Sequence, residues 1–145
     1  MLPLQEGTSA GTAAIAWLVG RLAFSWIFIL SGIGHLTKSE SMAQYAAAFK
    51  VPQPRLAVVL SGVIVLAGGL SVLLGVYVEA GTLLLVLFLV PVAIYMHPYW
   101  GVTDPMQAAT QRAHFMKNIS LAGAALLLWY FSHAAPGAWV YALHP

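Results

Sequence analysis

Cysteine is absent from this 145-residue chain, and charged side chains are scarce. Without cysteine there are no disulfides, no thiolate iron–sulfur clusters and no cysteine-ligated zinc. Six basic and four acidic residues make up 7% of the chain, whereas about a quarter of an ordinary soluble domain is charged. So few charges exclude a disordered chain, a nucleic-acid-binding protein and a typical soluble enzyme.

The chain is instead rich in long runs of hydrophobic residues. Hydrophobic residues make up 61% of it, which indicates an integral membrane protein. A spanning helix needs about 20 apolar residues, so few spans fit and little chain is left for a soluble domain. The prediction is one all-α membrane domain, residues 1–145, with spans at about 12–36, 56–76, 81–96 and 113–131.

A shorter helix is predicted between the first two spans, over Ser41–Val51. Apolar residues recur there at i, i+3, i+4 and i+7, from Met42 to Phe49, so they share one face. The segment is too short to span a membrane and fits a helix that lies in the headgroup region. Pro52 and Pro54 end it, because proline cannot continue the helical hydrogen-bond ladder.

The connections between the spans predict a bundle and its orientation. Two long segments, 37–55 and 97–112, fall on one face, and a tight turn at 77–80 falls on the other. This layout predicts a four-helix bundle in which spans two and three are antiparallel neighbours. The long segments and adjoining helix ends carry Lys38, Lys50, Arg55, Arg112 and Lys117. By the positive-inside rule that face is cytoplasmic, and both termini lie outside.

Polar and aromatic side chains gather on this same face. His35 ends the first span, His97 ends the third and His114 begins the fourth, while Asn118 lies one turn beyond His114 on the same helix face. A strip of hydrogen-bonding groups beside apolar helices suits the polar head of a quinone or a lipid. The candidate ligand-binding residues are His35, His97, Trp100, His114, Phe115, Lys117 and Asn118.

Other interpretations of these residues stay open. Polar and aromatic side chains are common at membrane interfaces, where they serve only as anchors. In other proteins, two histidines from facing helices can ligate a b-type haem. Here His35 and His97 lie at helix ends, which disfavours haem. Only two carboxylates, Asp104 and Glu40, lie nearby, which disfavours a metal site as well. We therefore predict no metal site, no covalently bound cofactor and no catalytic residue.

Arg21 is the one cation placed inside a predicted span. An ionisable residue there is costly and suggests a function. Its position near the outer face also allows its long side chain to reach the interface. Glu79, in the turn before the third span, lies on that face, so a structural ion pair between Arg21 and Glu79 is predicted.

Several short motifs, taken in order, resemble those of the DoxX family of small membrane proteins. The resemblance runs from about residue 21 to residue 131, nearly the whole chain, and it implies a four-span membrane bundle. The matching elements are Arg21, the run from Ser31 to Leu36, the segment from Phe49 to Pro54, Gly68 and Gly69, the run from His97 to Trp100, and the run from Phe115 to Asn118.

The same resemblance implies a link to redox chemistry. Some members resemble subunits of thiosulfate–quinone oxidoreductases, and others associate with membrane oxidoreductase complexes that handle oxidative stress. The family often carries a glutamate just before the paired glycines, where this chain has Val65. The missing carboxylate argues against a proton-coupled role and favours an accessory one.

The resulting prediction is a non-autonomous subunit of a respiratory or redox complex in a bacterial inner membrane. It would anchor a partner protein, bind quinone and lack catalytic activity alone, because the partner must supply the redox centre. Two alternatives stay open. One is a structural or assembly subunit without ligand chemistry, and the other is a homo-oligomeric transporter or channel, which four spans without an internal repeat disfavour.

Overall fold

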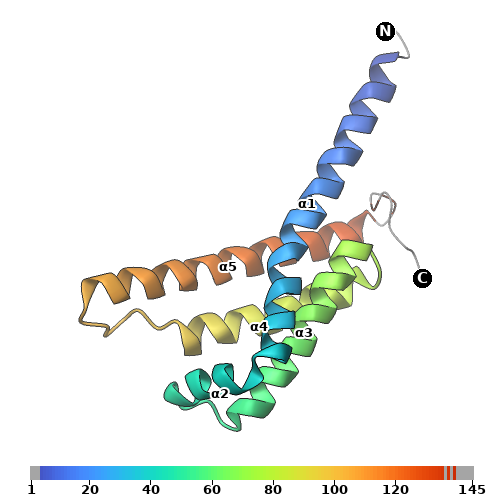
Figure 1. Cartoon of the computed structure of the whole chain (residues 1–145). Coiled ribbons are helices and arrows are strands. Elements are labelled where there is room, and N and C mark those ends of the chain that lie inside the picture. Colours follow the sequence, from blue (N-terminus) through green and yellow to red (C-terminus); the bar gives the residue numbers. More distant parts are fainter. Residues whose placement is uncertain (1–3, 136, 138, 140–145) are drawn as a thin grey trace.

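The computed structural model describes residues 4–135, 137 and 139, so the remaining residues of the predicted 1–145 domain lie outside it. Every regular element in the described part is an α-helix, which confirms the predicted all-α fold (Figure 1). The five helices are α1 (Leu4–Thr37), α2 (Ser39–Ala48), α3 (Pro54–Leu74), α4 (Val78–Met96) and α5 (Pro105–Ala134).

Local sequence signals set several helix ends. Pro54 opens α3 in its first turn, where a missing N–H costs nothing. Gly75 ends α3 in the left-handed region, at φ 72°, and its N–H donates to the carbonyl of Ser71. Asp104 caps α5, since its Oδ1 accepts from the backbone N–H of Gln107 at 2.7 Å. These ends follow from residue types alone.

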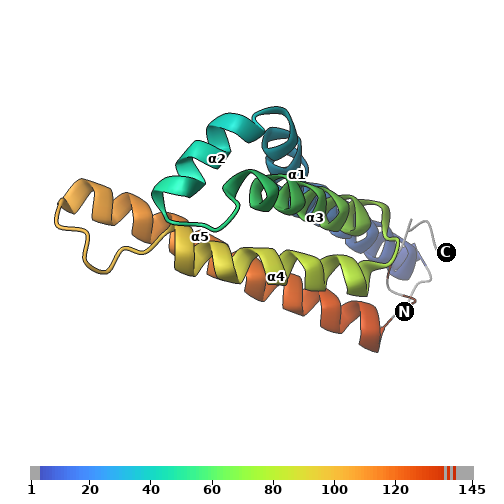
Figure 2. The ribbon, with the colours of Figure 1, turned by 90° about the horizontal axis from the view of Figure 1, so that it is seen from below.

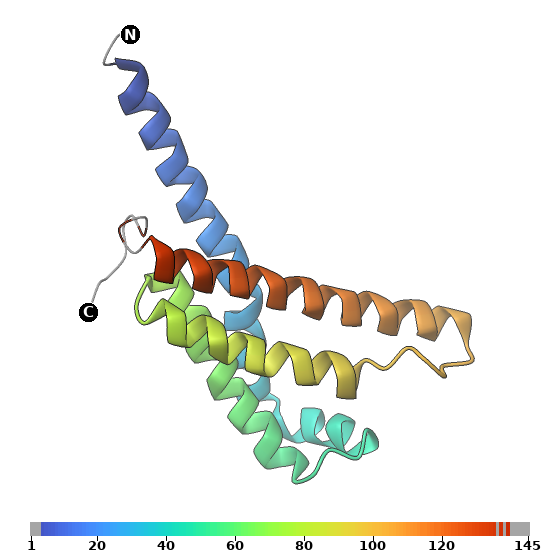
Figure 3. The same cartoon turned by 180° about the vertical axis from the view of Figure 1, so that it is seen from behind.

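The helices pack in the order α1, α3, α4, α5, and the short α2 lies against α3. The connections between α1 and α3 and between α4 and α5 lie at one end, and the tight α3–α4 turn lies at the other (Figure 3). The predicted antiparallel pairing of spans two and three is therefore confirmed. The first half of α1 projects beyond the other helices (Figure 1), and its side chains from Gly11 to Gly20 are mostly exposed.

Among the residues that the structure describes, three helices are long and apolar enough to cross a membrane: Gly11–Thr37, Pro54–Leu74 and Val78–Met96. They match the first three predicted spans. The predicted fourth span, 113–131, falls within α5, which runs beside α4 (Figure 3) but is not among the three. The reason is composition, since the first half of α5 carries Arg112, Lys117 and Asn118. Whether α5 crosses the membrane stays a prediction.

Glycines allow α3 to approach its two neighbours closely. A Cβ on Gly69 would lie 2.9 Å from the Cβ of Phe28 in α1, and one on Gly68 would lie 2.9 Å from the backbone oxygen of Gly81 in α4. Gly32 of α1 is packed as closely against α3, since a Cβ there would lie 2.7 Å from the Cβ of Leu66. Small residues at such positions let membrane helices pack at short range.

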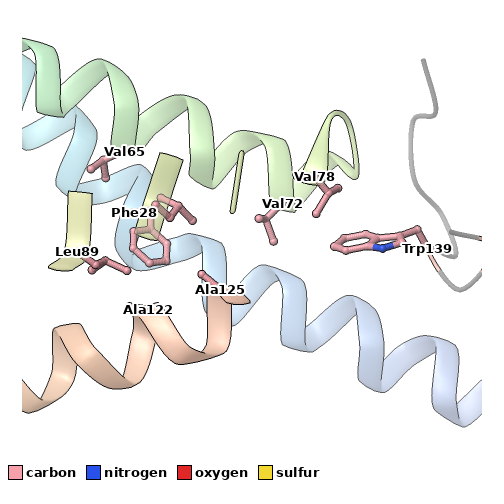
Figure 4. Close-up of a cluster of buried hydrophobic side chains, with 9 residues drawn as sticks. Phe28, Val65, Val72, Val78, Leu89, Ala122, Ala125 and Trp139 are labelled. Carbon is pink, nitrogen blue, oxygen red and sulfur yellow. The ribbon is translucent and has the colours of Figure 1, made fainter. Parts of the chain in front are cut away.

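The core lies where α1, α3, α4 and α5 meet (Figure 4). Phe28 of α1 is 2% exposed and points between Leu89 of α4 and the small residues Ala122 and Ala125 of α5. Val65 of α3 is fully buried in the same cluster. A carboxylate at position 65 would therefore sit among apolar side chains, where an unpaired charge is costly.

Candidate functional site

A large, mainly apolar cavity lies between α2, α3, α4 and the end of α1. Its volume is about 840 Å³. The helix α2 lies near the N-terminal end of α3 and the C-terminal end of α4, and so forms one wall (Figure 2). Side chains that line the cavity include His35, Tyr45, Ser61, Phe88, Pro91 and His97.

The wall formed by α2 is the face predicted from the sequence. Ala43 and Ala46 are buried against Val58 of α3, which fixes α2 on that helix. Met42, Tyr45, Ala46 and Phe49, the apolar set at helical spacing, all line the cavity. The amphipathic pattern predicted a helix at an interface, and in the structure its apolar side covers this cavity.

His35 is held at the cavity wall by a side chain from another helix. Its Nδ1 lies 2.8 Å from Oγ of Ser61, and that hydroxyl donates in turn to the carbonyl of Val58 at 2.9 Å. The imidazole is half-buried and meets the ring of Phe88 edge-on, with 5.9 Å between centroids. Ser61 was not predicted from the sequence, since a single serine in an apolar span, 26 residues from His35, gives no local signal.

His97 lies just beyond the end of α4, where it lines the cavity and also contacts side chains of α5. Its Nδ1 lies 2.9 Å from Oε1 of Gln111, and its ring stacks on that of His114 with centroids 5.0 Å apart. Burial lowers the pKa of His97, and the nearby His114 and Lys117 lower it further, while the hydrogen bond to Gln111 raises it. The net direction is downward, so the neutral form of the ring predominates at pH 7.

The other predicted ligand residues lie beside the cavity and do not line it. Trp100 and Phe115 contact each other edge-on at 5.8 Å, and Tyr99 joins both rings. His114 and Lys117 are exposed, and Asn118 is buried between the packed helices. Of the seven predicted residues, the structure thus brings two, His35 and His97, to the cavity. Within the described residues, no three metal-ligating side chains gather into a cluster.

The partner predicted for Arg21 was wrong. Arg21 is 2% exposed, and its guanidinium donates from Nε to the carbonyl of Val72 at 3.1 Å and from a terminal nitrogen to that of Leu73. The same group lies over the ring of Trp139, 5.2 Å from its centroid. Glu79 instead lies 3.6 Å from Nδ1 of His133 in α5.

This arrangement has a simple physical reason. The last carbonyls of a helix have no partner within it, and the helix dipole makes that end negative. Val72 and Leu73 are in the last turn of α3, so Arg21 of α1 supplies both the missing donors and the favourable charge. Two of the donors of this buried arginine are therefore satisfied by backbone carbonyls.

Comparison with known proteins agrees with this fold. The DoxX family model matches residues 16–98, which run from within α1 to just beyond α4. The inner membrane protein YphA of Escherichia coli (strain K12) is 30% identical over 111 residues, covering 77% of this chain and 79% of that protein. No solved structure matches. Three apolar helices and such a relative identify a multi-pass membrane protein.

Proposed function

This chain belongs to the DoxX family, and from that premise we propose that it binds an isoprenoid-type quinone in the cavity beside α2. The observation that carries the proposal is the cavity itself. It is about 840 Å³ in volume, mainly apolar, and has the imidazoles of His35 and His97 in its wall. Ligand sites typically measure roughly 300–1,000 Å³ and combine an apolar lining with a few polar groups.

The composition of the lining suits a ligand with a polar head and an apolar tail. Phe88, Pro91 and Met96 of α4 line the cavity together with the apolar side of α2. The polar side chains Tyr45 and Tyr95 are exposed at its edge. A lipid-soluble ligand would enter from the bilayer and keep its tail among the apolar helices, while its head reaches the histidines.

The redox role in this proposal depends on a partner protein. The sequence has no cysteine with which to hold a thiolate cluster. We therefore place the chain as a membrane subunit that anchors a partner, and the partner supplies the redox centre. The exposed apolar side chains on the projecting part of α1, Ile15, Leu18 and Val19, offer a surface for such a contact.

The membrane and the orientation are also part of the proposal. YphA is named as an inner membrane protein, and we assign this chain to the same membrane. Five of its six lysines and arginines lie at the end that holds the cavity: Lys38, Lys50, Arg55, Arg112 and Lys117. The positive-inside rule then puts this end and the cavity on the cytoplasmic side, with both termini outside.

A purely structural role is the second candidate, favoured by the projecting half of α1. Apolar side chains left exposed on a membrane helix face either lipid or another protein. In that case the cavity would be filled by lipid and the histidines would be anchors. A pore made by several copies would be a third arrangement, and flux through purified protein in liposomes would reveal it.

The experiment is a gentle purification of the tagged full chain from native membranes, followed by mass spectrometry of bound proteins and lipids. Ile64→Trp fills the cavity, while Val63→Trp, at the preceding position of α3, adds the same side chain to an exposed site. We expect quinone to copurify with the wild type and with Val63→Trp but not with Ile64→Trp. Equal quinone in all three preparations, or none in the wild type, would refute the site.

A further inference from the structure

The hydrogen bonds behind the two cavity histidines decide which of their nitrogens carries a proton. The Ser61 hydroxyl has one proton, and it donates this proton to the carbonyl of Val58. The short contact between Ser61 and His35 therefore requires His35 Nδ1 to be the donor. A neutral imidazole carries one proton, so Nε2 of His35 is left with a free lone pair.

The same logic holds for His97. Its Nδ1 faces Oε1 of Gln111, and a carbonyl oxygen can only accept. The proton of His97 is therefore on Nδ1, and Nε2 again keeps a lone pair. The lowered pKa of His97 keeps the ring in this neutral form at pH 7. His35 of α1 and His97, just beyond α4, thus have the same tautomer, fixed by two different partners.

Hydrogen-bond donors are scarce in the inner part of the cavity. Ser61 and Ser41 donate to backbone carbonyls, those of Val58 and Lys38. The remaining donors, Tyr45, Tyr95 and Lys50, are exposed at the edge. A ligand carbonyl placed beside His35 would find a lone pair and not a proton, whereas a ligand hydroxyl would find an acceptor.

We propose that the cavity selects ligands whose heads carry hydroxyl groups, and so takes the quinol in preference to the quinone. This inference rests on the proposed function and adds to it the redox state of the ligand. His35 Nε2 accepts the O–H of the head, and Ser61 acts as a positioning residue that holds His35 in the accepting tautomer. His97 and Gln111 provide a second acceptor of the same kind nearer the edge.

Binding of three matched probes to the purified full chain in nanodiscs tests this selectivity. The probes are a decyl-benzoquinol kept anaerobic, its dimethyl ether and the corresponding quinone, measured by calorimetry. One net hydrogen bond is worth about a factor of ten or less in affinity, so we expect the quinol to bind about tenfold more tightly than the ether or quinone. Dodecanol binding as tightly as the quinol would point to any lipid hydroxyl and overturn the quinol assignment.

Single substitutions test which side chains cause the preference for the quinol. His35→Phe should remove most of the preference for the quinol over its ether, and the matched control His133→Phe, at an exposed histidine outside the cavity, should retain it. Ser61→Ala should weaken the preference, and Ser61→Thr, which keeps the hydroxyl, should preserve it. A loss in Ser61→Ala that Ser61→Thr does not rescue would show a packing effect and overturn the positioning role.

The outcomes separate this inference from the proposed function. Equal binding of quinol, ether and quinone would overturn the selectivity and leave the quinone site standing. No binding of any probe would overturn the proposed function itself. A direct check needs no ligand: the nitrogen resonances of ¹⁵N-labelled His35 should report the proton on Nδ1, and a proton on Nε2 would refute the argument.

Discussion

Replacing Arg21 by methionine should destabilise the protein strongly, because the guanidinium of Arg21 caps the last carbonyls of α3. Methionine keeps much of the apolar length of the side chain but removes every donor. The carbonyls of Val72 and Leu73, at the end of α3, would lose the partner that Arg21 supplies. A buried group left without its hydrogen bond costs about 1–3 kcal/mol, so two groups together should cost about 2–6 kcal/mol.

The charge of Arg21 adds a smaller effect. A cation at a helix C-terminus contributes about 0.3–2 kcal/mol, more when it is partly buried. Arg21→Lys keeps this charge but offers a point donor in place of a planar fork, so it should fall between wild type and Arg21→Met. The matched control is Arg55→Met, because Arg55 is exposed and lies 3.9 Å from Glu40. Exposed pairs contribute about 0–1 kcal/mol.

The assay is denaturant unfolding of the purified full chain in detergent, followed by the loss of helical circular dichroism. Glu79→Gln separates the two explanations for Arg21. If backbone capping is correct, Glu79→Gln should have a small effect, because Glu79 contacts the exposed His133. Destabilisation by Glu79→Gln as large as that by Arg21→Met, or an Arg21→Met variant as stable as Arg55→Met, would refute the capping argument.

Three further predictions concern other elements. Gly68→Ala should cost about 1–3 kcal/mol in the same assay, because its Cβ would press on α4, whereas Gly123→Ala, with nothing within 4 Å, should be neutral or slightly stabilising. Asp104→Ala should cost about 1 kcal/mol by removing the cap of α5, and an unchanged midpoint would contradict the cap. Lys117→Ala should raise the pKa of His97, read by histidine NMR with the other rings as controls, and no rise would exclude that charge as a cause. Since the folded pKa of His97 lies below 6.5, the stability it contributes is present above pH 6.5 and is lost as pH falls through the folded value.

The parts of the fold that the sequence predicted depend on local chemistry. Apolar runs gave three spans, and prolines and glycine marked their ends. The face of α2 was predicted because helical spacing is readable within ten residues. The helix α1 nevertheless begins at Leu4, before its apolar stretch, since hydropathy measures where a helix meets lipid and not where backbone hydrogen bonding starts.

The parts that the sequence could not predict depend on pairs brought together by tertiary packing. Glu79 was the natural partner for Arg21 by charge, yet the carbonyls that bind Arg21 belong to every residue type and leave no trace in the sequence. Ser61 and Gln111 were equally hidden as partners of His35 and His97. The cavity itself arises from where α2 settles on α3, and no motif encodes its volume.

The contact between α1 and α3 links the two ends of the molecule. Near the start of α3, Ser61 fixes the tautomer of His35, and at its end Arg21 caps the last carbonyls. Both interactions cross from α1 to α3, and Gly62 lets the helices meet, since a Cβ there would lie 2.8 Å from the Cβ of His35. Sliding one helix by a single turn, about 5.4 Å, would break both contacts together. The register of this pair therefore determines both the stability of α3 and the acceptor that His35 presents to the cavity.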